Sequence, residues 1–288
     1  MLDLLVASPE REFKLTEIVG ALGINKATCH AIVTTMVERG YLVRAPGSKA
    51  YMLGSAVILA GYAAEHANPA VHAARTVVPA LARDLDVESV ASVVERDVIT
   101  VVEWAPAPGS GRNAAVHRST PWSHVGQRVP LVPPFGAAHL AWSTDDRIAE
   151  WLERAGDAAD EVELRESLAA IRRRGFDAQV ENAQLDKFRT MLAAIDLDQL
   201  STSSRVAVSR LVAELGHVEH LPVELTADRT YDINALAAIV FDSASRPLLT
   251  LSVHPAAPLL GVDVMTMGQR LRSVADGVTE SIGGISPR

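Results

Sequence analysis

The sequence is poor in the residues on which several classes of protein depend. Cys29 is the single cysteine among 288 residues, which excludes an internal disulfide framework and a zinc site built from cysteines. Aromatic residues amount to 5%, and the longest uncharged stretch near the N-terminus, residues 50–64, is too short to cross a membrane. We therefore expect a protein of a reducing compartment that has no membrane partner.

Signals for export and for common cofactors are also missing. Met1 is followed by Leu2, Asp3 and Leu4 without the basic segment that opens a secretory signal peptide, which favours the cytoplasm. The G-x-S-x-G, P-loop and Rossmann glycine patterns, which indicate hydrolases and nucleotide cofactors, do not occur. The sequence thus predicts neither a catalytic residue nor a cofactor.

The side chains that could suggest chemistry have simpler explanations. Cys29 and His30 are neighbours, and on a helix their side chains point about 100° apart, too far for a thiolate–imidazole pair. His217 and His220 could share one helix face, but a metal ion needs three or four convergent ligands, and Glu214 and Glu219 do not guarantee them. We expect a core cysteine, a solvated helix and no metal site.

Length and charge indicate two domains, with one large α/β domain as the alternative. Hydrophobic residues make up 48% and charged residues 22%, which is typical of globular proteins. The first 54 residues carry six basic and five acidic side chains, a net charge of +1, whereas the whole chain carries −8. The remaining −9 belongs to the second domain and does not prevent the first from binding DNA.

The first forty residues show three short helical patterns. Leu2, Leu5 and Val6 form the stripe of a first helix, and a second is expected from an N-cap at Thr16 to a closing glycine at Gly23. A third helix follows the potential N-cap Asn25. Its apolar stripe, expected to face the core, consists of Cys29, Ile32, Val33, Met36 and Val37.

The opposite face of the third helix and the segment after it suggest contacts with DNA. That face carries short hydrogen-bonding groups and cations without a carboxylate before Glu38, and residues 41–44 and 50–53 read as a β-hairpin after Gly40. A hairpin behind a helix-turn-helix is a wing, although a small helical domain that binds protein has the same pattern. The residues expected to bind DNA are Asn25, Lys26, Thr28, His30, Thr34, Arg44 and Lys49.

Three segments in this region resemble the IclR family of bacterial transcriptional regulators. They are Leu22–His30 (LGINKATCH), Val37–Leu42 (VERGYL) and Tyr51–Gly54 (YMLG), in the family's order and at plausible spacing. The family usually has an arginine directly after the histidine of the recognition helix, where this chain has Ala31. One contact to phosphate or base is therefore missing or supplied elsewhere.

The resemblance continues through Gly126–Leu131, Ile171–Phe176 and Leu249–Pro255. It implies an α+β protein with a winged helix-turn-helix domain over residues 1–54, a helical linker over 55–68 and an effector-binding domain over 69–288. The effector-binding domain would be GAF-like, an antiparallel sheet with helices. Where the family reaches its next strand within a few residues, this chain has a helical insertion near residues 182–231, which could be a lid, an interface or a pocket wall.

The resemblance also places a pocket for a small organic or aromatic acid. It would lie between a loop, the start of a helix and the last strands, where Ser252 and His254 are two residues apart and so point to one side. Pro133-Pro134 could instead be a rigid turn, and a strand serine is often a core residue. The expected effector-binding residues are Leu131, Val132, Pro133, Pro134, Phe135, Gly136, Ala137, Ala235, Ser252 and His254.

The sequence thus predicts a ligand-responsive regulator that binds double-stranded operator DNA, with repression expected rather than activation. We expect a homodimer joined through the apolar linker helix, and the resemblance allows a dimer of dimers. One alternative is a metabolic enzyme acting on a small organic acid, with His254 as base and a degenerate winged helix for oligomerisation. A scaffold that binds a protein partner is another.

Overall fold

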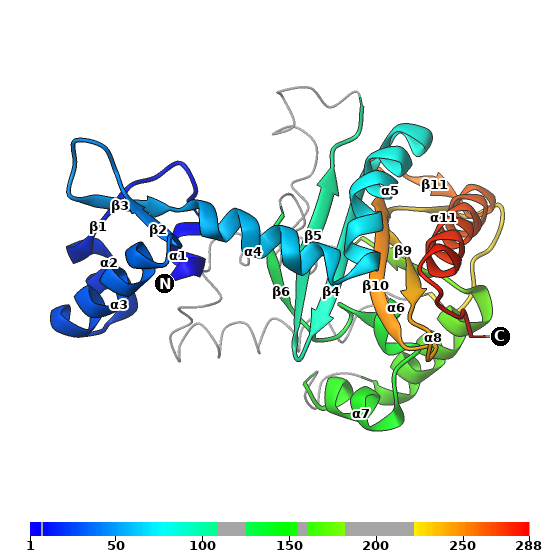
Figure 1. Ribbon diagram of the computed structural model, residues 1–288. Coiled ribbons are helices and arrows are strands. Elements are labelled where there is room, and N and C mark those ends of the chain that lie inside the picture. Colours follow the sequence, from blue (N-terminus) through cyan, green and yellow to red (C-terminus); the bar gives the residue numbers. More distant parts are fainter. Residues whose placement is uncertain (7, 109–124, 155–159, 182–221, 288) are drawn as a thin grey trace. The chain divides into compact units, whose positions relative to one another are not determined.

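The computed structural model describes residues 1–6, 8–108, 125–154, 160–181 and 222–287 (Figure 1). The chain divides between Pro69 and Ala70 into two compact units, and each is considered by itself. No helix in these ranges is both long and apolar enough to cross a membrane.

The first unit is a helix-turn-helix with a wing. Its three strands form one small sheet in the order β1-β3-β2, in which β2 and β3 are the expected hairpin. The strand β1 was not foreseen, and it pairs with β3 on the side away from β2. The elements are α1 (Leu2–Val6), β1 (Phe13–Lys14), α2 (Leu15–Leu22), α3 (Lys26–Glu38), β2 (Leu42–Arg44), β3 (Ala50–Leu53) and α4 (Ser55–His66).

The turn between α2 and α3 is set by two residues that the sequence identifies. Gly23 ends α2 in the left-handed conformation at φ 62°, which costs a residue without a Cβ little. Asn25 caps α3, because its Oδ1 accepts the backbone N–H of Thr28 at 2.8 Å. The expectation that Thr16 caps α2 is wrong: α2 already begins at Leu15, where Glu17 accepts the N–H of Lys14 at 2.8 Å.

The core of this unit confirms most of the apolar stripe on α3. Cys29 and Val33 are fully buried against residues of α1, α2 and the sheet, and burial raises the pKa of the Cys29 thiol. Ile32, expected in the core, is 40% exposed instead, because Cys29 and Val33 define the centre of the buried face and Ile32 lies at its margin.

The second unit is built on a six-stranded antiparallel sheet in the order β6-β5-β4-β10-β9-β7. In this sheet β4 and β5 form a hairpin and are joined at Arg96 and Asp97. The main strands are β4 (Glu88–Glu95), β5 (Val98–Ala105), β6 (Arg128–Pro130), β7 (Asp177–Val180), β9 (Ile233–Phe241) and β10 (Pro247–His254). A separate two-stranded sheet pairs β8 (Thr230–Tyr231) with β11 (Leu259–Leu260).

Helices cover both faces of the six-stranded sheet. One face packs against α5 (Pro69–Leu85) and α11 (Gly261–Ser281) in the largest core cluster. The other faces α6 (Ala137–Leu140), α7 (Asp145–Glu153) and α8 (Glu161–Arg174), which share a second cluster with β5, β6 and the loop after them. The expected α+β class, a winged helix-turn-helix followed by a GAF-like antiparallel sheet, is confirmed.

The insertion expected near residues 182–231 lies mostly outside the described residues, which resume at Pro222. Of its length only residues 222–231 are described, and they include β8. Its expected helices at residues 182–221 therefore stay a prediction.

The helix α11 approaches the rest of the second unit closely at one glycine. A Cβ on Gly268 would overlap the ring of Phe176, which is itself fully buried just before β7. On the same helix, a Cβ on Gly277 would meet no atom within 4 Å of the described residues. The two glycines thus differ in surroundings while sharing a helical backbone.

This difference predicts opposite effects of one substitution. Gly268→Ala should lower the free energy of unfolding by about 1–3 kcal/mol, because overpacking outweighs the gain in helix propensity. Gly277→Ala, the matched control, should raise it by up to about 1 kcal/mol. Urea unfolding followed by circular dichroism measures both, and equal effects of the two changes would contradict the close approach.

Candidate functional site

The residues expected to bind DNA lie exposed on α3 and on the wing of the first unit. Lys26, Thr28, His30 and Thr34 are all exposed on α3. The side-chain oxygen of Asn25 is engaged in the cap of α3, so this residue orients the helix. The arrangement presents α3, the second helix of the helix-turn-helix, as the element that can enter a major groove.

The wing, which follows this helix in the sequence, carries two exposed cations. Arg44 lies on β2 with its guanidinium 6.0 Å from the ring centroid of Tyr51, and Lys49 lies in the turn. The turn is held by Ser48, whose hydroxyl donates to Glu12 at 3.1 Å and accepts the N–H of Ala50 at 3.1 Å. An ordered hairpin with cations at its rim is suited to contact the DNA backbone.

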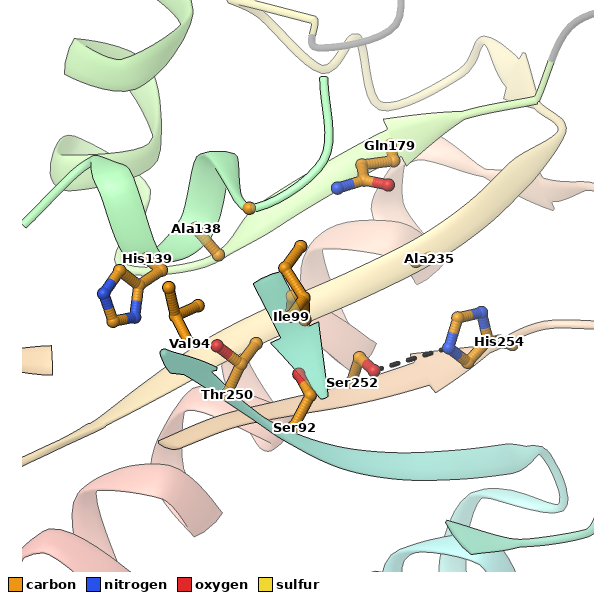
Figure 2. A pocket seen from close by; sticks show the side chains of 12 residues that line it. Ser92, Val94, Ile99, Ala138, His139, Gln179, Ala235, Thr250, Ser252 and His254 are labelled. Carbon is orange, nitrogen blue, oxygen red and sulfur yellow. Dashed lines mark hydrogen bonds between the residues drawn. The ribbon is translucent and has the colours of Figure 1, made fainter. Parts of the chain in front are cut away.

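The second unit contains a narrow cavity between α6 and the sheet (Figure 2). With its open mouth it encloses about 470 Å³, of which about 40 Å³ is wide enough for the centre of a water molecule. A ring-sized ligand therefore requires the lining side chains to move apart. The described lining residues are Ser92, Val94, Ile99, Gly136, Ala138, His139, Gln179, Ala235, Ala237, Thr250, Ser252 and His254.

Four of the expected effector-binding residues line this cavity. They are Gly136 from the segment before α6, Ala235 on β9, and Ser252 and His254 on β10. The last two point to the same side of their strand, as expected, and Ser252 Oγ lies 3.4 Å from His254 Nε2.

The other expected residues do not reach the cavity. Phe135, expected to flank a ligand, is fully buried in the cluster beneath α7, and its carbonyl accepts the indole N–H of Trp151 at 3.0 Å. The expected helix N-terminus is a single short turn, because α6 spans four residues. The residues placed away from the cavity are Leu131, Val132, Pro133, Pro134, Phe135 and Ala137.

The orientation of the His254 ring follows from its hydrogen bonds. Its Nδ1 lies 2.9 Å from the carbonyl oxygen of Asn234, which can only accept, so Nδ1 carries a proton. In the neutral ring Nε2 is then the acceptor, on the side of Ser252. A neutral His254 therefore offers a ligand a hydrogen-bond acceptor, and a protonated one offers a second donor.

Several polar lining residues were missed by sequence reasoning. Ser92 on β4 pairs directly with Thr250 on β10, so both side chains emerge on the cavity face. Gln179 on β7 reaches the same cavity from the sheet edge. Alternation along β10 from Ser252 would have found Thr250, whereas Ser92 and Gln179 depend on the register between strands.

The cavity offers no permanent charge among its described lining residues. Burial, together with the nearby charge of Arg147, lowers the pKa of His139 to about 4, so its ring is neutral at physiological pH. The polar groups are hydroxyls, imidazoles and one amide. An acidic ligand would thus be held by hydrogen bonds, with His254 as the group able to add a positive charge.

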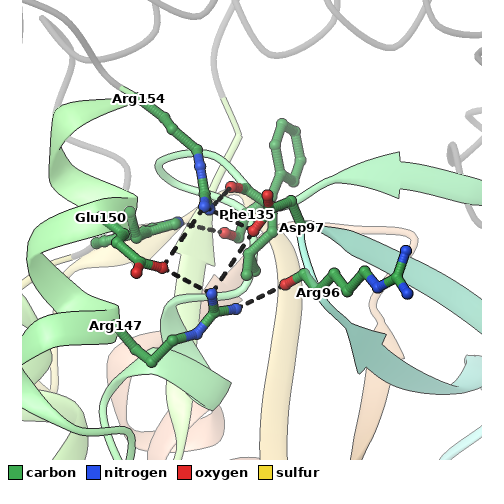
Figure 3. Close-up of polar contacts among 8 residues, drawn as sticks. Arg96, Asp97, Phe135, Arg147, Glu150 and Arg154 are labelled. Carbon is green, nitrogen blue, oxygen red and sulfur yellow. Dashed lines mark hydrogen bonds and ion pairs between the residues drawn. The ribbon is translucent and has the colours of Figure 1, made fainter.

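Surface ion pairs hold the loop that leads into α6 (Figure 3). Arg154, directly after α7, contacts Asp97 in the β4–β5 turn at 2.6 Å and donates to the carbonyl of Leu131 at 3.2 Å. Arg147, two turns earlier on the same face of α7, donates to the carbonyl of Arg96 at 2.6 Å and pairs with Glu150 at 2.7 Å. These contacts tie the hairpin, the loop and α7 together at one side of the cavity.

Asp177, two residues before Gln179 on β7, has a fully buried carboxyl group. The amide of Gln179 donates to Asp177 Oδ2 at 3.0 Å, while Asp177 Oδ1 has no hydrogen-bond partner among the described residues. Burial raises the pKa of Asp177 to about 6, and the Gln179 bond and the charge of Arg174 oppose it. Burial also lowers the pKa of Arg174.

The raised pKa predicts that stability depends on pH through Asp177. Between about pH 4 and 6 the folded state holds the proton that the unfolded state has lost, so the free energy of unfolding should fall as pH rises, by about 3 kcal/mol in all. Asp177→Asn should remove this part of the fall, as urea unfolding at each pH would show. The exposed control Asp228→Asn should retain it, and parallel curves for wild type and Asp177→Asn would contradict the prediction.

Metal-ligating side chains do not converge in the part of the chain that the structure describes: no three of them form a group that could hold an ion. The candidate residues Glu214, His217, Glu219 and His220 lie outside the described residues.

Comparison with known proteins agrees with this geometry. Residues 1–46 match the family model described as the IclR helix-turn-helix domain. No curated protein sequence matches the chain significantly.

Solved structures match the chain over nearly its full length. An IclR transcriptional regulator from Alicyclobacillus acidocaldarius is 22% identical with a TM-score of 0.64, over 98% of this chain and 95% of that one. Pseudomonas aeruginosa HmgR is 18% identical with a TM-score of 0.61, over 98% and 96%.

A third matched structure contains a ligand. It is an IclR homolog from Microbacterium hydrocarbonoxydans in complex with 4-hydroxybenzoate, 16% identical with a TM-score of 0.58, over 98% of this chain and 97% of that one. Residues 1–46 thus match the IclR helix-turn-helix domain, and the chain as a whole has the fold of the IclR family of transcriptional regulators.

Proposed function

We propose that the protein is a ligand-responsive transcriptional regulator that binds operator DNA through its first unit and a small organic or aromatic acid through its second. The observation that carries the proposal is the combination of an IclR helix-turn-helix domain with a cavity in a separate GAF-like unit. The matched structures are of transcriptional regulators, and nothing in them favours the enzyme alternative.

DNA binding is supported by the exposed groups of α3 and the wing. Lys26, Thr28, His30 and Thr34 are available to bases or phosphates in a major groove, and Arg44 and Lys49 to phosphates or the minor groove. Because the rest of the chain is acidic, this small region has to supply the attraction to DNA.

This role predicts that removal of one of these cations weakens DNA binding. Lys26→Ala and Arg44→Ala should each reduce the slope of log affinity against log salt by about 1, because one phosphate contact is lost. Fluorescence anisotropy with duplexes from the protein's own and neighbouring promoters measures the slope. The control Arg165→Ala removes an exposed cation of α8 and should leave it unchanged. If neither variant changes the slope, DNA does not contact α3 and the wing as proposed.

Effector binding is supported by the cavity and by its polar groups. The row of Ser92, Thr250, Ser252 and His254 gives one wall hydrogen-bonding capacity, and the small side chains Ala235 and Ala237 leave room for a flat body. One matched relative was solved with 4-hydroxybenzoate, a flat hydroxy acid. The same chemistry suits this cavity once it widens.

The cavity predicts which serine matters for the ligand. Ser252→Ala should weaken binding of 4-hydroxybenzoate or benzoate about three- to tenfold, the value of one neutral hydrogen bond, as measured by isothermal titration calorimetry. The matched control is Ser89→Ala, because Ser89 on β4 is buried on the opposite face of the sheet and its hydroxyl has no described partner. Equal losses in both variants would place the ligand elsewhere, and no binding of either acid would exclude the aromatic-acid assignment.

A homodimer is supported by the surface of α4. This helix buries none of its residues within the chain, and Ile58, Leu59 and Tyr62 are 74%, 69% and 62% exposed. A second copy of the chain is the partner we propose for this apolar surface, with a dimer of dimers as a further assembly. Two winged domains bound to two half-sites would gain the affinity that one small domain lacks.

For the ligand to regulate DNA binding, it must bind two arrangements of the DNA-binding units with different affinities. We propose that the effector favours the arrangement that does not fit the operator, so that the protein acts as a repressor released by its ligand.

A further inference from the structure

The outer face of α3 is unusually rich in methyl groups for a DNA-reading surface. Opposite the buried Cys29 and Val33 lie Ala27, Ala31 and Thr35, all of them exposed. Thr28 and Thr34 flank this row, and both are exposed as well. The helix-turn-helix is the site already described, and these side chains determine what it can recognise.

Two polar groups near this face are used within the protein itself. The hydroxyl of Thr35 donates to the backbone carbonyl of Ala31 at 3.1 Å, so this hydroxyl is engaged within the helix and the methyl group is the part of the exposed side chain left for a contact. The side-chain oxygen of Asn25 accepts the N–H of Thr28 at 2.8 Å. The face therefore offers fewer hydrogen-bonding groups than its composition suggests.

Apart from Lys26 at its first position, this helix carries none of the side chains that read guanine and adenine through paired hydrogen bonds. From Lys26 to Glu38 there is no arginine, asparagine or glutamine, and the carboxylate Glu38 is the last residue of the helix. The possible donors to bases are Lys26, His30 and the hydroxyls of Thr28 and Thr34. In the major groove the base feature that matches a methyl surface is the C5-methyl group of thymine.

We propose that α3 recognises its operator through thymine methyl groups, packed against Ala27, Ala31 and Thr35, so that the contacted half-site is rich in A·T pairs. The inference rests on the proposed DNA-binding function and specifies the sequence class that this function selects. Lys26 and His30 lie further round the helix, beyond Thr34, and are left for phosphates or for an isolated guanine.

The test separates this inference from the function on which it rests. Duplexes that the full-length protein prefers are first selected from a random pool and compared with shuffled duplexes by fluorescence anisotropy. Each thymine of the half-sites is then replaced by deoxyuridine, which removes the C5-methyl group alone and leaves the protein unchanged. Deoxyuridine at flanking thymines outside the half-sites is the matched control.

We expect A·T-rich half-sites and a loss of affinity of about fourfold for each contacted thymine, the value of one buried methyl group. Flanking replacements should change nothing. Ala31→Arg supplies the missing bidentate donor and should shift the selected base near this position towards guanine while removing the effect of deoxyuridine there. Thermal unfolding would establish that this variant is folded.

The outcomes are distinct. Preferred duplexes that are G·C-rich, or whose affinity does not respond to deoxyuridine at any half-site position, would overturn methyl recognition and leave the regulator intact. If no duplex is preferred over its shuffled version, the proposed DNA-binding function fails, and the inference fails with it.

Discussion

The register of β10 between β4 and β9 is the constraint on which the second unit depends. Leu249, Leu251 and Val253 enter the core under α5 and α11, and the alternate residues Thr250, Ser252 and His254 necessarily emerge on the cavity face. A shift by one residue would turn the polar set into the core and the apolar set towards the cavity. The position of this one strand between its two neighbours therefore fixes both the core and the cavity wall.

Local signals in the sequence were sufficient for much of the fold. Gly23 and Asn25 act within a few residues of themselves, so the turn before α3 could be predicted in detail. The same kind of reasoning failed at Thr16, because α2 starts one residue earlier than expected, with Lys14 at the N-cap position and the carboxylate of Glu17 accepting the Lys14 N–H. The sequence pattern pointed to a residue type that often caps helices and did not contain the backbone conformation that places the first turn.

The cavity was less predictable for reasons of long-range packing. Ser252 and His254 follow from strand alternation, but Phe135 is buried in a core cluster whose other members, such as Trp151, come from later parts of the chain. Ser92 and Gln179 reach the cavity through pairings across the sheet, which connect distant parts of the chain. The neutral state of His139 likewise arises from burial and the charge of Arg147 on another helix.

The ion pairs of Arg147 and Arg154 connect the shape of an interior cavity to the surrounding solution. Asp97 and Glu150 are more than half exposed, so dissolved salt screens their attraction to both arginines. These pairs hold the loop before α6, and α6 forms the wall opposite the sheet. We therefore expect the ease with which the cavity widens for a larger ligand to depend on ionic strength, although no permanently charged side chain of the described residues lines it.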